Sequence, residues 1–122
     1  MRRPAIIAVV VLATAALAGP AWSEMRCGWL QNPTPGNYFL LDSEAEWTAA
    51  AQGGLRAKGL DNSADLLAGD YVRTNGYYGY ACVCMAVSVD RENKRITRIE
   101  TVAQKRLDDC RRDPKLPRPP AP

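Results

Sequence analysis

Two cysteines separated by one residue, Cys82 and Cys84, are the side chains whose type and spacing come closest to a reactive site. A dithiol with this spacing could exchange disulfides if one thiol had a lowered pKa, which requires a helix N-terminus or a neighbouring cation. The flanking residues are tyrosine, alanine and methionine in a run typical of a β-strand, and they supply neither. A structural role is therefore favoured, and a thiol–disulfide redox protein acting through this pair is the alternative.

The full set of cysteines, Cys27, Cys82, Cys84 and Cys110, predicts a disulfide framework, because an even number in a short exported chain is typical of one. In an extended strand the side chains of Cys82 and Cys84 lie on the same face, and their Cα atoms are separated by about the largest distance that a disulfide can span. A bond between them is therefore disfavoured. Two schemes stay open: 27–82 with 84–110, or 27–84 with 82–110. Loop-closure entropy stabilises both to a similar extent and does not distinguish them.

The sequence contains no histidine, which removes the imidazole base of Ser-His-Asp and Cys-His sites and the usual ligand of catalytic zinc. Carboxylates could still hydrolyse a glycoside, but no spacing among the acidic residues near turns defines a pair: Asp42, Glu44, Glu46 and Asp70. We therefore expect no catalytic residue, no metal, no cofactor and no enzymatic activity.

The first 23 residues are typical of a signal peptide, with Arg2 and Arg3 before an apolar run over residues 5–18. That run is shorter than the roughly 20 residues of a transmembrane helix. Ala21 and Ser23 have the small side chains that precede a cleavage site, which favours cleavage after Ser23 over the alternative after residue 18. We expect a periplasmic or secreted protein with no stable membrane anchor after cleavage.

Residues 24–112 are expected to form a single small domain, and residues 113–122 a tail that carries five of the nine prolines. Such a tail should be extended, solvated and disordered, although a PxxP ligand is an alternative interpretation of residues 116–122. Without Arg2 and Arg3, 14 of the 16 basic residues face 13 acidic ones, a net charge of +1. With no basic stripe among aromatic residues, nucleic-acid binding is not expected.

Alternating and β-branched residues predict strands at 37–41, 70–74, 77–89 and 95–103, with a tight turn at Asn75-Gly76 and a polar hairpin loop at 90–94. On the long strand, the core face is expected to carry the valines and Met85, while both cysteines lie on the opposite face. Ile96 and Ile99 share a face only if a bulge intervenes. A turn of helix is expected at 65–68, and a short helix or an irregular arm at 104–112.

Residues 43–54 carry conflicting signals. Ser43 and Glu46 form a capping box that predicts a short helix, but the segment is only about two turns long. The fold class predicted is mainly β, a small antiparallel sheet or partly closed barrel with one or two short helices, stapled by two disulfides.

The stretches CGWLQNPTPGNYFL, EWTAAAQGG, RTNGYYGYACVCMAV and KRITRIE resemble a family of small exported proteins, mostly from Gram-negative bacteria, that has no known function. The resemblance covers most of residues 26–112. It implies a bridged scaffold instead of a catalytic dithiol. It also favours a strand over residues 47–53, where the family carries β-branched residues and this chain has alanines.

The predicted function is a non-enzymatic binding protein for an unknown protein or glycan of the cell envelope, for example an inhibitor or immunity-type partner of an envelope-acting enzyme. Tyrosines in glycine-rich turns offer rigid amphipathic contact area. The candidate binding residues are two tryptophans and four residues in or after the 75–76 turn: Trp29, Trp47, Asn75, Tyr77, Tyr78 and Tyr80.

Overall fold

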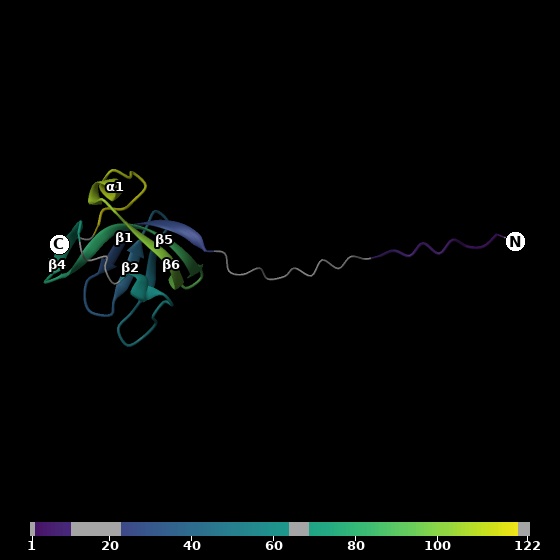
Figure 1. Cartoon of the computed structure of the whole chain (residues 1–122), viewed down its shortest axis with the longest axis horizontal. Helices are drawn as coiled ribbons and strands as arrows, with labels where there is room; N and C mark the ends of the chain where they lie inside the picture. The colour runs from purple at the N-terminus through teal and green to yellow at the C-terminus, as the bar shows by residue number, and fades with distance from the viewer. Residues whose placement is uncertain (1, 11–22, 64–68, 120–122) are drawn as a thin grey trace.

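Strands make up most of the folded part of the chain, as the alternating sequence patterns predict. The computed structural model describes residues 2–10, 23–63 and 69–119. Residues 2–10 carry no helix or strand; the rest of the predicted signal peptide and the helical turn predicted at 65–68 fall largely outside the described residues. The elements are β1 (Glu24–Asn32), β2 (Tyr38–Leu41), β3 (Glu46–Ala50), a 3₁₀ turn (Leu60–Ser63), β4 (Tyr71–Asn75), β5 (Tyr78–Asp90), β6 (Arg95–Lys105) and α1 (Leu107–Arg111) (Figure 1).

One sheet of six strands, ordered β1-β2-β3-β6-β5-β4, curls until β1 also pairs with β5. The strands β1, β2, β3, β6 and β5 therefore form a ring. All pairings are antiparallel except the contact between β3 and β6, where Thr48 opposite Arg95 is the single parallel pair. The expected mainly β fold, a partly closed barrel stapled by two disulfides, is confirmed.

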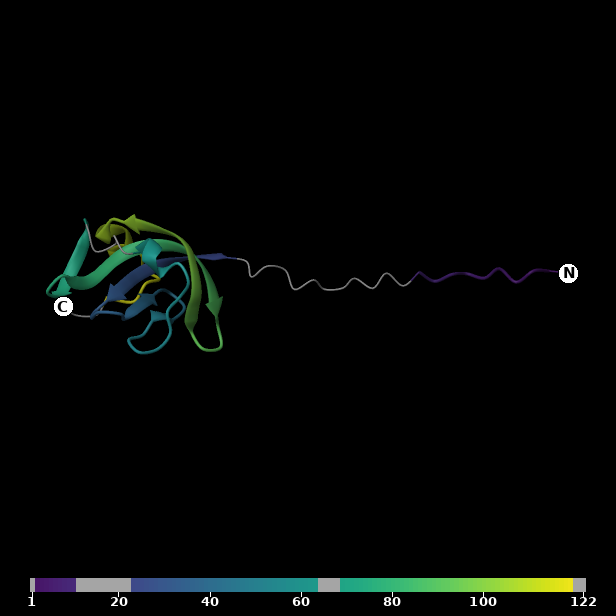
Figure 2. The same cartoon turned by 60° about the horizontal axis from the view of Figure 1, so that its bottom comes forward.

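The long strand β5 has neighbours along both of its sides. On one side β1 pairs with it from Gly79 to Val87. On the other side β4 pairs with its first residues, up to Ala81, and β6 takes over from Cys82 onward. Figure 2 shows the resulting arrangement, with the β4–β5 turn and the β5–β6 hairpin at opposite ends of the molecule.

The barrel interior is filled by the predicted face of β5. Val83, Met85 and Val87 are fully buried there, and residues from β1, β2, β3 and β6 pack against them. Ile96 and Ile99 both reach this core because the pairing of β5 with β6 shifts register twice, between residues 86 and 87 and between 88 and 89. The condition under which Ile96 and Ile99 share a face, an intervening bulge, is therefore met.

The segment with conflicting signals forms strand β3 and not a helix. The Asp42 side chain accepts hydrogen bonds from the backbone N–H groups of Glu44 and Ala45, both at 2.9 Å, so this carboxylate closes a turn where the capping box predicted a helix start. Trp47 and Ala49 then alternate into the barrel core. The helix alternative is wrong because core packing of these residues outweighs local helix propensity.

A second apolar cluster lies outside the barrel. Its buried members come from β1, β5 and α1 and are Trp29, Tyr80, Cys82, Leu107 and Cys110. Leu116 packs against this cluster, so contacts with the domain continue past residue 112, where the tail was predicted to begin. No helix in the described part of the chain is long and apolar enough to cross a membrane.

Candidate functional site

The β4–β5 turn displays an aromatic side chain in solvent. A tight turn follows β4 as predicted, but its two central residues are Gly76 and Tyr77, one position later than Asn75-Gly76, because Asn75 still belongs to β4 and pairs with Tyr78. Gly76 has a φ of +59°, a left-handed conformation that favours glycine. Tyr77 follows at once and is 75% exposed, while Tyr78 is half-buried. Of the large apolar and aromatic side chains that the structure describes from residue 23 onward, Tyr77 is the most exposed.

A cation lies against this tyrosine. The Arg73 guanidinium is 5.0 Å from the centroid of the Tyr77 ring, and its Nε donates a hydrogen bond to the Tyr71 hydroxyl at 3.2 Å. Arg73 is not among the binding residues predicted from the sequence. Its place two residues before Asn75 could have indicated it, since residues that flank a tight turn face each other across the hairpin.

A neighbouring loop is fixed against the turn. The Asn75 side chain donates to the Pro33 carbonyl at 3.4 Å, and the Asn32 amide nitrogen donates to the carbonyls of Thr34 and Asn37 at 2.9 and 2.8 Å. These bonds hold both loops in one arrangement. We call the surface formed by Arg73, Asn75, Gly76, Tyr77 and Tyr78 the tyrosine tip.

The other three candidate residues lie in the core and not at the tyrosine tip. Trp29, Trp47 and Tyr80 are 1%, 0% and 6% exposed. Trp29 and Tyr80 pack edge to face, with ring centroids 5.3 Å apart, in the cluster outside the barrel. The structure therefore brings Asn75, Tyr77 and Tyr78 together and assigns the remaining three to packing.

A buried arginine gathers acidic groups at the other end of the barrel. The Arg26 guanidinium contacts Asp42 at 2.7 Å, Glu24 at 2.8 Å and Glu44 at 2.6 Å, and it lies 4.1 Å from the centroid of the Trp47 ring. Its side chain is 7% exposed. We call Arg26 and these four partners the arginine cluster.

Two carboxylates of the arginine cluster, Asp42 and Glu44, have lowered pKa values that favour their charged form. Burial by itself would raise the pKa of Asp42, but hydrogen bonds from the Ala45 N–H, Arg26 and the Glu44 N–H outweigh it and lower that pKa. The hydrogen bond from Arg26 likewise lowers the pKa of Glu44. A glycosidase needs one carboxyl group with a raised pKa as general acid, so these two acids do not form such a pair.

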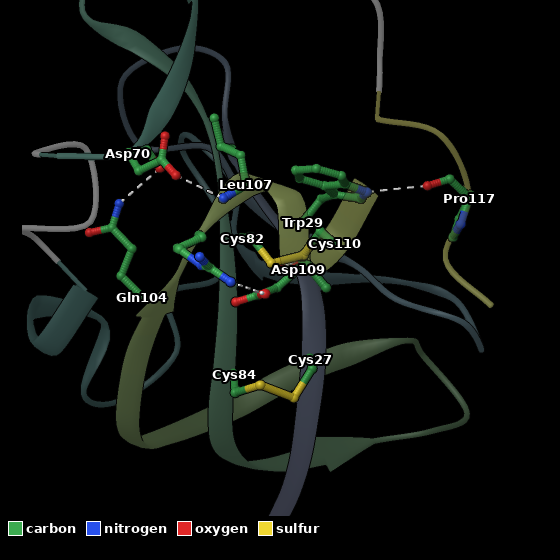
Figure 3. Close-up of a disulfide and its surroundings, with 12 residues drawn as sticks. Cys27, Trp29, Asp70, Cys82, Cys84, Gln104, Leu107, Asp109, Cys110 and Pro117 are labelled. Atoms are coloured by element: carbon green, nitrogen blue, oxygen red, sulfur yellow. Dashed lines mark hydrogen bonds and ion pairs between the residues drawn. A yellow bond between two sulfur atoms is a disulfide. The ribbon is translucent and has the colours of Figure 1, made fainter. Parts of the chain in front are cut away.

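The two disulfides lie side by side on the outer face of β5 (Figure 3). Cys27 is bonded to Cys84 and Cys82 to Cys110, which is the second of the two schemes left open, and all four cysteines are bonded. The disfavoured bond between Cys82 and Cys84 is absent, as predicted. The two cysteines of the CxC pair thus belong to different disulfides, which gives the pair a structural role in this oxidised form.

A hollow of about 270 Å³ lies beside the disulfides. Its lining comprises all four cysteines together with residues from β5, β6, α1 and the start of the tail: Val83, Lys105, Asp109, Asp113 and Leu116. A second hollow of about 210 Å³ lies between residues 55–58 and the start of β6. The described residues contain no group of three or more side chains placed to hold a metal ion.

Comparison with known proteins gives a family but no characterised relative. No curated protein and no solved structure matches the chain. A family model described as "Protein of unknown function (DUF4087)" matches residues 21–117, which include every described strand and α1. The chain therefore belongs to the DUF4087 family.

Proposed function

We propose that this chain is an exported, non-enzymatic binding protein that contacts a protein partner through the tyrosine tip. The observation that carries the proposal is the 75% exposure of Tyr77 on a turn whose flanking residues are fixed by hydrogen bonds. Export is supported by the predicted signal peptide and by the two disulfides, because such bonds persist in oxidising compartments.

The chemistry of the tip suits a protein interface. Tyrosine and arginine are enriched among the residues that dominate binding energy, and Tyr77 and Arg73 are already in contact before any partner arrives. Because Asn75 joins the turn to the neighbouring loop and Arg73 already contacts the Tyr77 ring, less conformational entropy remains to be lost on association.

The shape of the tip favours a protein over a glycan. Small ligands bind in concave sites, whereas the two hollows described above lie away from Tyr77 and Tyr78. A projecting hairpin instead fits a cleft on a partner. An inhibitor or immunity-type partner of an envelope-acting enzyme is therefore the version that we favour, with glycan binding as the competing one.

The test uses the mature chain beginning at Glu24, immobilised and exposed first to purified lysozyme and then to periplasmic extract. Tyr77→Ala should weaken a specific complex by about 30-fold, the loss expected of an interface residue worth about 2 kcal/mol. Met25→Ala is the matched control, since Met25 is 65% exposed and lies near the opposite end of β5, paired with Ala86. It should leave affinity unchanged.

Two results would count against this function. One is a stoichiometric complex that survives Tyr77→Ala and Arg73→Ala with unchanged affinity. The other is retention of isolated peptidoglycan by the wild-type chain with no protein bound, which would favour the glycan version.

A further inference from the structure

The cluster outside the barrel contains two aromatic side chains on the outer face of the sheet. Neighbouring residues of a strand point to opposite faces, so Leu30 enters the barrel core and Trp29 points outward. Outward-facing residues of a barrel usually meet solvent. Trp29 is nevertheless 1% exposed. We use the name outer groove for the apolar surface of Trp29, Tyr80, Leu41 and Val72 beside which the tail lies.

The proline-rich tail lies against the outer groove. Leu116 packs against the apolar cluster outside the barrel, and the Trp29 indole Nε1–H donates a hydrogen bond to the Pro117 carbonyl at 3.2 Å (Figure 3). The tail begins with a turn, in which the Leu116 N–H donates to the Asp113 carbonyl at 3.2 Å. It is therefore attached to the domain by an apolar anchor and by a directional bond.

Burial along the tail has a period of three. Residues 113, 116 and 119 are half-buried, whereas 114, 115, 117 and 118 are exposed. The first of these intervals, from 113 to 116, is the hydrogen-bonded turn, whereas the second, from 116 to 119, has the three-residue repeat of the polyproline II helix. Proline-rich segments in this conformation bind grooves lined by aromatic side chains. This chain therefore contains both components of that recognition mode: the outer groove supplies the aromatic side chains, and the tail supplies the proline-rich segment.

We propose that the outer groove is a binding site for proline-rich peptides, occupied in the free protein by the chain's own tail. The occupant that it would accept from a partner is an extended segment with a leucine–proline step, because Leu116 and Pro117 are the residues that make the contacts. The leucine side chain packs against the cluster that contains Trp29 and Tyr80, and the following proline carbonyl accepts the indole N–H of Trp29. This surface is separate from the tyrosine tip.

The tail would act as a built-in competitor. Leu116 follows Cys110 by six residues, and the Cys82–Cys110 disulfide fixes that point on β5. A segment tethered so closely has an effective concentration of the order of millimolar or higher. A partner peptide must compete with the tail at this effective concentration. Weakening the attachment of the tail should therefore strengthen binding of the partner peptide.

The experiment uses the isotope-labelled mature chain, whose tryptophans are Trp29 and Trp47, and the synthetic peptide DPKLPRPPAP as probe. NMR resolves the two indole N–H signals. Trp47 donates to Asp42 at 3.1 Å in the arginine cluster, so its signal is an internal control for folding. Leu116→Asp should displace the tail and shift the Trp29 signal while the Trp47 signal stays in place.

Peptide titration then tests the groove directly. The peptide should bind Leu116→Asp at least tenfold more tightly than wild type and return the Trp29 signal toward its wild-type position. Leu55→Asp is the matched control, since Leu55 is 45% exposed and lies in the loop after β3; it should behave as wild type. If Leu116→Asp disturbs the Trp47 signal, Leu116→Ala replaces it.

Three outcomes would overturn the proposal. The Trp29 signal could be the same in wild type and in both Leu116 variants, which would mean that the tail does not occupy the groove. The peptide could fail to move the Trp29 signal of a folded variant. Finally, the wild-type signal could change with protein concentration as a dimer forms, which would indicate exchange of tails between two copies.

Discussion

Arg26 shows how a single buried charge is made compatible with a small core. Burial lowers the pKa of an arginine, but hydrogen bonds from its guanidinium to Asp42 and Glu44 more than compensate, so its pKa is raised. Arg91 extends the cluster by contacting Glu24 at 2.7 Å and Glu44 at 2.6 Å. Of the three carboxylates that contact Arg26, that of Asp42 is the buried one.

Removing the charge of Asp42 should therefore be costly. In Asp42→Asn the buried Arg26 guanidinium loses the negative charge of its buried partner. The substitution should lower the free energy of unfolding by about 3 kcal/mol in urea denaturation. Asp61→Asn is the control, because Asp61 is 88% exposed in its contact with Arg56 and should contribute less than about 1 kcal/mol. Equal effects of the two substitutions would show that the arginine cluster does not stabilise the fold.

The same carboxylate predicts a pH dependence. The folded-state pKa of Asp42 is lowered, so its contribution is present above the unfolded value of about 4 and is lost as pH falls through the folded pKa. Unfolding measured between pH 7 and pH 2 should show stability falling in the acidic range, with a shallower fall in Asp42→Asn. Parallel curves for the two proteins would contradict this assignment.

At the scale of elements, the position of the tyrosine tip depends on how closely β4 approaches β5. A Cβ atom on Gly79 would lie 1.8 Å from the Val72 carbonyl oxygen, which is backbone and cannot rotate away. Glycine at this position therefore permits the pairing of Arg73 with Gly79 that positions the turn.

Gly79→Ala should separate β4 from β5. We expect a loss of about 1 to 3 kcal/mol in unfolding free energy, typical of overpacking, and faster hydrogen exchange of the β4 amides. Gly54→Ala is the control, since its Cβ would meet nothing closer than 3.6 Å, and it should change stability by less than about 0.5 kcal/mol. Unchanged β4 protection in Gly79→Ala would refute the steric argument.

Much of the element pattern could be predicted because it follows local rules. The alternation of Val83, Met85 and Val87 identified the buried face of β5, and Asn75-Gly76 identified the turn. The segment around Trp47 stayed ambiguous because a capping box favours helix, while the pairing of β3 with β2 that decides the matter involves residues elsewhere in the chain.

The candidate site was predicted only in part, for a related reason. The sequence shows where an aromatic residue lies in a strand, but it does not show which face of the sheet other elements will bury. Trp29 and Tyr80 are buried by α1 and the tail, which pack from more than 25 residues away, whereas Tyr77 has no such cover. The contact of Arg73 with Tyr77 depends on the exact hairpin register, which includes a bulge between Arg73 and Asn75.

At the scale of the whole molecule, the disulfides tie both ends of the domain to β5. Their sequence separations are 57 and 28 residues, for which the loop-entropy model gives stabilisation of about 4 and about 3.5 kcal/mol. The two disulfides differ more in solvent exposure than in their contribution to the free energy of unfolding. Cys27 is exposed, whereas Cys82 and Cys110 are 3% and 4% exposed.

Mild reduction should therefore break the two disulfides one after the other. A limiting amount of dithiothreitol should open Cys27–Cys84 first, because a thiolate must reach a sulfur atom to attack it. Differential alkylation followed by peptide mass mapping would identify the labelled cysteines, and unreduced protein in denaturant should label none. Labelling of Cys82 and Cys110 before Cys27 and Cys84 would contradict the order.

The pairing of β1 with β5 also has a consequence for synthesis. β1 is the first strand of the domain, yet its partner residues begin at Gly79, so more than 40 residues must follow before the ring can close. A nascent chain that has reached only β3 lacks the strand on which the rest assembles. Contacts between such distant residues slow folding, and the domain should therefore fold only after β5 has been synthesised, in milliseconds to seconds as for other barrels of this kind.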